Sequence, residues 1–89
     1  MSEDPVAAFL RARAQDHHAT ARGVRAAARA QRDTADMQAV ADRVEGLGDM
    51  FVTMAGLLED QGDAEARRLL RVLAELHADH PEYRPEWRP

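Results

Sequence analysis

Four histidines are the residues best suited to chemistry in this chain of 89 residues, which contains no cysteine. His17 and His18 are adjacent, and His77 and His80 lie three positions apart near the C-terminus. Imidazoles on facing helices are a common way to build a metal site. The alternative is that His17 and His77 are boundary residues bonded to the backbone or to an acid. Because no HxxxH or ExxH pair is present, His17, His77 and His80 are weak metal candidates, and we predict no cofactor.

Other catalytic chemistry finds little support in the sequence. Ser2 is the only serine, there is no thiol, and no glycine-rich loop follows a strand to hold phosphate. The acidic residues of the middle segment fall mostly away from its apolar positions, where charge normally meets water. An acid–base pair needs a cleft that perturbs pKa values, and a slim helical protein offers little room for one. We therefore expect no enzymatic activity.

Helix signals divide the chain into three segments and a tail. Asp4-Pro5 is a good helix opening, because Asp is a favoured N-cap and Pro a favoured first residue. We predict helices over about 5–31, 34–61 and 63–79. Extending the first helix straight into the second would rotate the apolar face by nearly half a turn, so we place a turn there, with Asp33 or Thr34 as the cap. Gly62 and Asp63 are the expected cap residues between the second and third helices.

These segments predict an all-α fold, a small three-helix bundle in which the first and third helices run parallel. That arrangement would place His17 and His77 nearly level. Pro81 disfavours helical geometry at the residue before it and ends the third helix. We expect one domain over 1–80 and an extended tail over 81–89 that packs on the bundle through Tyr83 and Trp87.

The second segment has the clearest periodicity. Apolar residues follow alternating spacings of three and four, which is typical of a helix-packing surface. The positions of this heptad stripe are Met37, Val40, Val44, Leu47, Phe51, Met54 and Leu58. The stripe is either the interface of a homodimer or the inward face of a monomeric bundle. We predict the homodimer, because the first helix offers mainly alanine beyond Val24 and alanine buries little area.

Three glycines lie inside this second helix, at positions 46, 48 and 56. Each costs about 1 kcal/mol relative to alanine in a helix interior. Since the stripe continues through them, we expect close backbone contacts at these glycines and not a break.

Charge is unevenly distributed along a chain whose net charge is −4 and whose basic residues are all arginine. Residues 1–32 carry a net +3, residues 33–66 a net −8, and residues 67–89 a net +1. A basic stripe on the first helix is a candidate partner surface for phosphates or an acidic protein; it consists of Arg22, Arg25, Arg29 and Arg32. The alternative is a solvated face paired with the acidic second helix. A pI near 5.5 argues against nucleic acid.

The function that these features favour is a non-enzymatic interaction or scaffold module, self-associating and open to a further protein partner. The alternatives are a histidine-based metal-binding bundle and a nucleic-acid-associated regulator that uses the arginine stripe. No apolar run approaches the ~20 residues of a membrane span, and "MSEDPVAA" is acidic, unlike a signal peptide. We expect a cytoplasmic protein without membrane contact.

Both ends of the chain resemble a family of small actinobacterial proteins of unknown function. The matching stretches are "DPVAAFLRARAQDHHATAR", which includes "AFLRAR", and "LRVLAELHADHPEYRPEWRP", which includes "HADHPEYRPEWRP". Members of that family often have a cysteine-containing, loop-rich centre, which this chain replaces with the heptad stripe. The resemblance therefore transfers no metal site and implies no activity. A second class, secreted helical hairpins, would place a turn at "EGLGD", but Leu47 stands where such a turn carries Trp.

Overall fold

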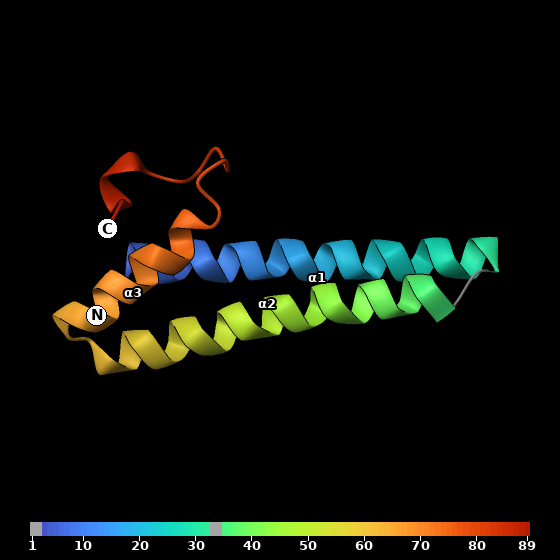
Figure 1. Cartoon of the computed structure of the whole chain (residues 1–89), viewed down its shortest axis with the longest axis horizontal. Helices are drawn as coiled ribbons and strands as arrows, with labels where there is room; N and C mark the ends of the chain where they lie inside the picture. Colours follow the sequence, from blue (N-terminus) through green and yellow to red (C-terminus); the bar gives the residue numbers. More distant parts are fainter. Residues whose placement is uncertain (1–2, 33–34) are drawn as a thin grey trace.

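A computed structural model describes residues 3–32 and 35–89 of the chain. The helices are α1 (Pro5–Gln31), α2 (Ala35–Gln61) and α3 (Ala64–Glu75), followed by the short 3₁₀ helix η1 (Pro85–Trp87). Figure 1 shows α1 and α2 as a long antiparallel hairpin, with α3 and the C-terminal segment gathered at one end. No strand occurs in the described residues. The prediction of an all-α protein with three helices is confirmed.

The opening of α1 follows from the two residues that mark it in the sequence. The carboxylate of Asp4 accepts hydrogen bonds from the backbone N–H groups of Val6 (2.8 Å) and Ala7 (3.4 Å). These N–H groups have no partner within the helix, which is why an N-cap side chain stabilises it. Pro5 occupies the first turn, where its missing N–H costs nothing.

The ends of α1 and α2 use residues with positive φ. Arg32 caps α1 with φ 59°, although arginine rarely adopts this conformation. The predicted caps Asp33 and Thr34 lie outside the described residues. Gly62 follows α2 with φ 65°, and Asp63 caps α3 through a 2.7 Å bond from Ala66 N–H. The predicted roles of Gly62 and Asp63 are thus confirmed.

Helix α2 continues without interruption through residues 45–49. A helical-hairpin turn at "EGLGD" is therefore excluded. The three glycines are not equivalent, however. A Cβ atom on Gly46 or Gly56 would meet nothing within 4 Å, so the expectation of close contact is wrong at these two positions. At Gly48 it would lie 3.0 Å from the carbonyl oxygen of Ala14, so the expectation holds there.

The third helix is shorter than predicted, ending at Glu75 and not at residue 79. Beyond it the backbone forms tighter turns, with His77 N–H bonded to the Ala74 carbonyl (2.9 Å) and His80 N–H to the His77 carbonyl (3.0 Å). Such i→i+3 bonds commonly close a helix end. The tail is not extended throughout either, because residues 85–87 form η1.

Small residues at heptad spacing form the contact between α1 and α2. They are fully buried or nearly so, and a stripe of this kind lets two helix backbones approach closely. The set consists of Ala7, Ala14, Ala21 and Ala28 on α1 and Ala41, Gly48 and Ala55 on α2. The alanines that seem to supply too little core in the sequence are therefore the packing surface of the hairpin.

The large core residues lie at the end of the hairpin where α3 crosses it obliquely (Figure 1). Phe9 and Leu10 of α1, Phe51 of α2 and Leu70 of α3 are buried there together. The molecule measures 49 × 24 × 21 Å. Since α3 has 12 residues against 27 in each of the other helices, the three-helix part of the bundle covers only one end.

Candidate functional site

The heptad stripe predicted on α2 divides between two faces of the helix. Phe51 is only 3% exposed and lies inside the chain, whereas Val40 is 51% and Leu47 is 41% exposed. Met37, Val44, Met54 and Leu58 are half-buried. The prediction that all seven residues form one interface with another molecule is therefore wrong for Phe51. Residues 41, 48 and 55 face α1 in place of 40, 47 and 54.

An apolar surface remains on the side of α2 that α1 does not cover. The outer face of α2, as we call it, consists of Val40, Leu47, Met50, Met54 and Leu57. Met50 is 43% and Leu57 is 61% exposed. Position 43 (Arg43) and position 61 (Gln61) complete the same heptad pattern. The sequence prediction identified three of the five apolar residues and missed Met50 and Leu57.

Helix α3 extends this surface. Leu69, Val72 and Leu76 are 44%, 41% and 70% exposed, respectively. Between α2 and α3 runs a groove of about 270 Å³ with an almost wholly apolar lining. Its lining residues are Met54, Leu57, Leu58, Gln61, Leu69, Val72 and Leu73. The outer face of α2 and the groove thus form one continuous apolar region.

The opposite side of the hairpin is held by ion pairs between α1 and α2. Arg25 donates to Asp42 (2.7 Å) and to Glu45 (2.5 Å). Nε2 of His18 lies 2.9 Å from Oδ1 of Asp49. One residue of the predicted arginine stripe is therefore engaged within the chain, as the charge distribution suggested. Arg22, Arg29 and Arg32 are exposed.

Further ion pairs on this side involve Arg11, nearer the start of α1. Arg11 donates to Glu59 at 2.6 Å and to Glu3 at 2.5 Å, and the backbone N–H of Asp4 also donates to Glu59 at 3.1 Å. The hydrogen bond from Arg11 is the largest cause that lowers the pKa of Glu59, followed by the backbone bond from Asp4. These contacts fix the start of α1 to the end of α2.

The structure brings His17 and His77 together, with ring centroids 5.8 Å apart. His17 also stacks on Phe51 at 5.9 Å, and His77 meets the edge of Phe51 at 4.8 Å. His80 lies beyond them and contacts Arg13. Among the described residues, no group of three or more His, Asp or Glu side chains is arranged to hold a metal ion. The paired histidines offer fewer ligands than the three or four of a protein zinc site.

Burial is the main cause that lowers the pKa of His77, and the nearby His17 acts in the same direction. Arg13 and His80 add smaller effects of the same sign, while the backbone carbonyl of Leu73 opposes them. Nδ1 of His77 is buried and makes no hydrogen bond of good geometry to the described residues. His77 is therefore half-buried against the core residue Phe51, in surroundings that disfavour its charged form.

Arg13 is a buried charge that sequence analysis missed. Its side chain lies over the ring of Phe9, 5.0 Å from the centroid, and is only 6% exposed as a residue. It reaches Asp16 at 3.3 Å and Glu82 at 3.5 Å. The available signal was its place four residues after Phe9 on the same helix face. Arg13 links α1 to the tail.

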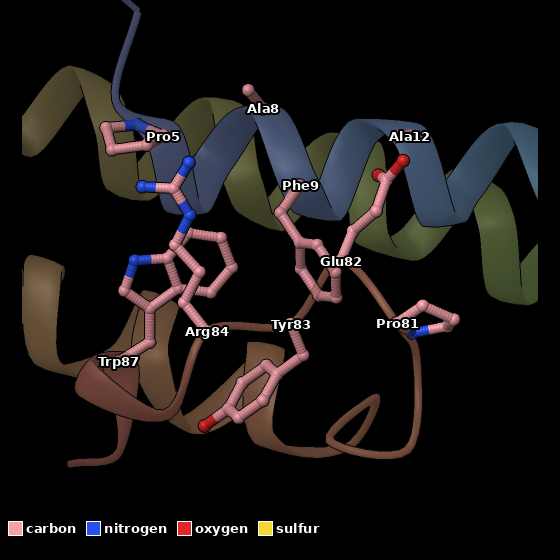
Figure 2. A pocket seen from close by; sticks show the side chains of 9 residues that line it. All are labelled: Pro5, Ala8, Phe9, Ala12, Pro81, Glu82, Tyr83, Arg84 and Trp87. Atoms are coloured by element: carbon pink, nitrogen blue, oxygen red, sulfur yellow. The ribbon is translucent and has the colours of Figure 1, made fainter.

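The tail covers Phe9 with two aromatic rings, as Figure 2 shows. The ring centroid of Trp87 lies 5.2 Å from that of Phe9, and the ring centroid of Tyr83 lies 6.0 Å from it. Both residues are buried. The Arg84 guanidinium lies over the Trp87 ring at 5.8 Å. Beside them is a cavity of about 500 Å³, whose lining residues are Pro5, Ala8, Phe9, Ala12, Pro81, Glu82, Tyr83, Arg84 and Trp87. These side chains pack the tail against α1.

In the part of the chain that the structure describes, every helix is too short or too polar to cross a bilayer.

No curated protein and no solved structure matches the chain. Residues 37–89 match a family described as a family of unknown function, DUF6221. The match takes in the second of the two resembling stretches, "LRVLAELHADHPEYRPEWRP", and leaves out the first. It covers all of α2 but its first two residues, together with α3 and the tail, which is more than half of the sequence, and on this evidence the chain belongs to the DUF6221 family of unknown function.

Proposed function

We propose that this protein is a non-enzymatic helical interaction module that self-associates through the outer face of α2 and the adjoining surface of α3. One observation carries the proposal. Among residues 3–32 and 35–89, eight large apolar residues are exposed, and seven of them lie on this surface of α2, α3 and the residue that caps α3. The seven are Val40, Leu47, Met50, Leu57, Leu69, Val72 and Leu76, while the eighth, Val52, lies on another side of α2.

The position of these residues on one side of the molecule supports their contact with one and the same partner. Single exposed apolar residues are normal on protein surfaces, but a continuous patch on one side marks an interaction site. Removing a Leu, Met or Val side chain from water contributes about 1.5–3 kcal/mol when its burial is complete. Several such side chains at heptad spacing match the pattern by which two helices pack side by side.

The remaining chemistry supports a binding role over a catalytic one. The paired histidines are engaged with Phe51, and three acids of α2 are engaged with α1 through Arg25 and His18, namely Asp42, Glu45 and Asp49. The cavity beside the tail is lined by aliphatic and aromatic groups together with Glu82 and Arg84. A further cavity of about 480 Å³ lies where α1 begins and α2 ends, and its carboxylates Asp4 and Glu59 are engaged with the Val6 N–H group and with Arg11. The apolar region is left as the feature that a partner would recognise.

The test compares two substitutions at equally exposed positions on α2. Leu47 is 41% exposed on the outer face, and Val52 is 40% exposed about 140° away around the helix. Size-exclusion chromatography with light scattering should show that Leu47→Glu reduces the mass to that of one chain. Val52→Glu should leave the mass of the wild-type assembly unchanged. Equal masses for wild type and Leu47→Glu would contradict the proposal, and circular dichroism of both variants controls for folding.

A further inference from the structure

The polar residues within the outer face of α2 determine how two copies can meet. The heptad pattern runs 40, 43, 47, 50, 54, 57 and 61, and its only polar members are Arg43 and Gln61. Asp60, an exposed acid, is adjacent to Gln61. One polar residue is thus near each end of the pattern, with Leu47, Met50, Met54 and Leu57 between them.

A parallel arrangement of two α2 helices is unfavourable on this pattern. It would bring Arg43 of one copy beside Arg43 of the other, within the apolar contact. Like charges that face each other across a helix pair are destabilising, and a lone arginine within an apolar contact leaves a charge without a partner.

An antiparallel arrangement removes this conflict. When Leu47 of one copy lies against Leu57 of the second copy, Met50 lies against Met54. Arg43 then faces Gln61 of the second copy and is within one residue of Asp60. The four large apolar side chains of each copy, Leu47, Met50, Met54 and Leu57, then meet those of the other copy. The charges that come close, Arg43 and Asp60, are of opposite sign. Moving the helices by one heptad would instead place Arg43 against Met54, so the pattern also selects the register.

The groove between α2 and α3 fits the same arrangement. Its α2 wall includes Leu57, and its α3 wall includes Leu69 and Val72. In the antiparallel register, Leu47 of the second copy comes to the position of Leu57 and therefore meets this groove. An apolar helix side chain entering a groove between two helices is a common form of helix recognition. Two-fold symmetry repeats the contact, so both grooves are filled.

We infer that the partner of the outer face is a second copy of this chain, with the two α2 helices antiparallel and Leu47 of each copy against Leu57 of the other. This inference rests on the proposed function and specifies its geometry. It further assigns the pair Arg43 and Asp60, one from each copy, to the ends of the contact.

Single cysteines test the orientation, because the natural chain has none to interfere. Leu47→Cys and Leu57→Cys are made in separate chains, mixed, allowed to exchange subunits, and oxidised. We expect a disulfide-linked dimer from the mixture and little from either variant alone. Each variant chain has one cysteine, so no link can form within a chain. The two positions are ~15 Å apart along the helix, so a parallel dimer in register could not link position 47 to position 57. A dimer that crosslinks through Leu47→Cys alone would overturn the antiparallel arrangement.

Charge reversal gives a second, non-covalent measurement. Arg43→Asp should raise the dimer dissociation constant about two- to thirty-fold, the combined range of two symmetric exposed ion pairs, and adding Asp60→Arg should restore it. Failure to restore would overturn the assigned pair. If the unmodified chain has the mass of a single copy, the proposed function itself fails. A dimer that neither crosslinks nor responds at position 43 overturns only the inferred geometry.

Discussion

A Cβ atom on Gly48 would lie 2.8 Å from Nε2 of His18, so this glycine is the point where α2 approaches α1 most tightly among the glycines of the helix. The carbonyl oxygen of Ala14 would be 3.0 Å away on the same side. His18 in turn contacts Asp49. The close packing of the hairpin and one of its ion pairs therefore depend on the missing side chain.

Gly48→Ala should destabilise the protein despite the better helix propensity of alanine. The added methyl group must displace His18 from Asp49 and press on the Ala14 carbonyl, and overpacking costs about 1–3 kcal/mol. We expect a net loss of about 1 kcal/mol after the propensity gain of about 1 kcal/mol. Gly46→Ala is the control, because it has open space and should stabilise. Chemical denaturation of the three proteins measures the difference, and equal gains for both variants would contradict the close approach.

Removing the Trp87 side chain should destabilise the domain by about 3 kcal/mol, the range for a large buried aromatic. Trp87 is 8% exposed and contacts both Phe9 and Tyr83. Thermal unfolding of Trp87→Ala should show a clearly lower Tm, whereas Arg88→Ala, at an exposed neighbouring position, should leave Tm nearly unchanged. An unchanged Tm for Trp87→Ala would mean that the tail does not pack on α1 in solution.

Tyr83→Phe should be neutral or stabilising. The Tyr83 hydroxyl is buried and makes no hydrogen bond to the described residues, and a buried unsatisfied group costs about 1–3 kcal/mol. The ring contact with Phe9 at 6.0 Å is retained in the variant. Tyr83→Ala, which loses the ring, should be destabilising. A large loss of unfolding free energy in Tyr83→Phe would show that the hydroxyl has a partner.

Stability should fall as the pH decreases below neutrality, because of His77. Its pKa in the folded protein is lowered from 6.5, chiefly by burial and then by His17. At a pH between the two pKa values, the unfolded chain therefore binds a proton at His77 more readily than the folded chain does. The contribution of neutral His77 to the free energy of unfolding is fully present above about pH 6.5. It is lost as the pH falls through the pKa of His77 in the folded protein.

Unfolding measured between pH 7.5 and 5.5 tests this expectation in the wild type and in His77→Gln. The variant should show a flatter dependence on pH over this interval, although its stability at neutral pH is lower because the ring contacts with Phe51 and Phe9 are gone. Parallel pH profiles for the two proteins would exclude His77 as the source of the acid sensitivity.

The ends of the helices were predictable where a residue has a strong local preference. Asp4, Pro5, Gly62 and Asp63 act through their own backbone or side chain, so the sequence identifies the boundaries they form. The end of α3 was not predictable in the same way. Residues 76–79 are compatible with a helix, and the tighter turns there are stabilised by contacts of His77 and His80 with Phe9, which is distant in sequence.

The faces of α2 were harder to predict because large residues dominate a periodicity analysis. Val40, Leu47 and Met54 fit one heptad pattern with Val44 and Phe51, yet Ala41, Gly48 and Ala55 are what α1 covers. Small residues are favoured between helices that approach closely. Because they are only weakly hydrophobic, a search for hydrophobic periodicity does not detect that role. The burial of Arg13 was also hard to predict. Asp16 and Phe9 are near it on the same helix, but Glu82 and His80, which complete its surroundings, are distant in sequence.

The most direct test of self-association is native mass spectrometry of the untagged wild-type protein over a range of concentrations. We expect a species of twice the chain mass of 9.9 kDa, which dissociates on dilution and disappears in Leu47→Glu. A mass of 9.9 kDa at every concentration, from a protein that circular dichroism shows to be folded, would contradict it.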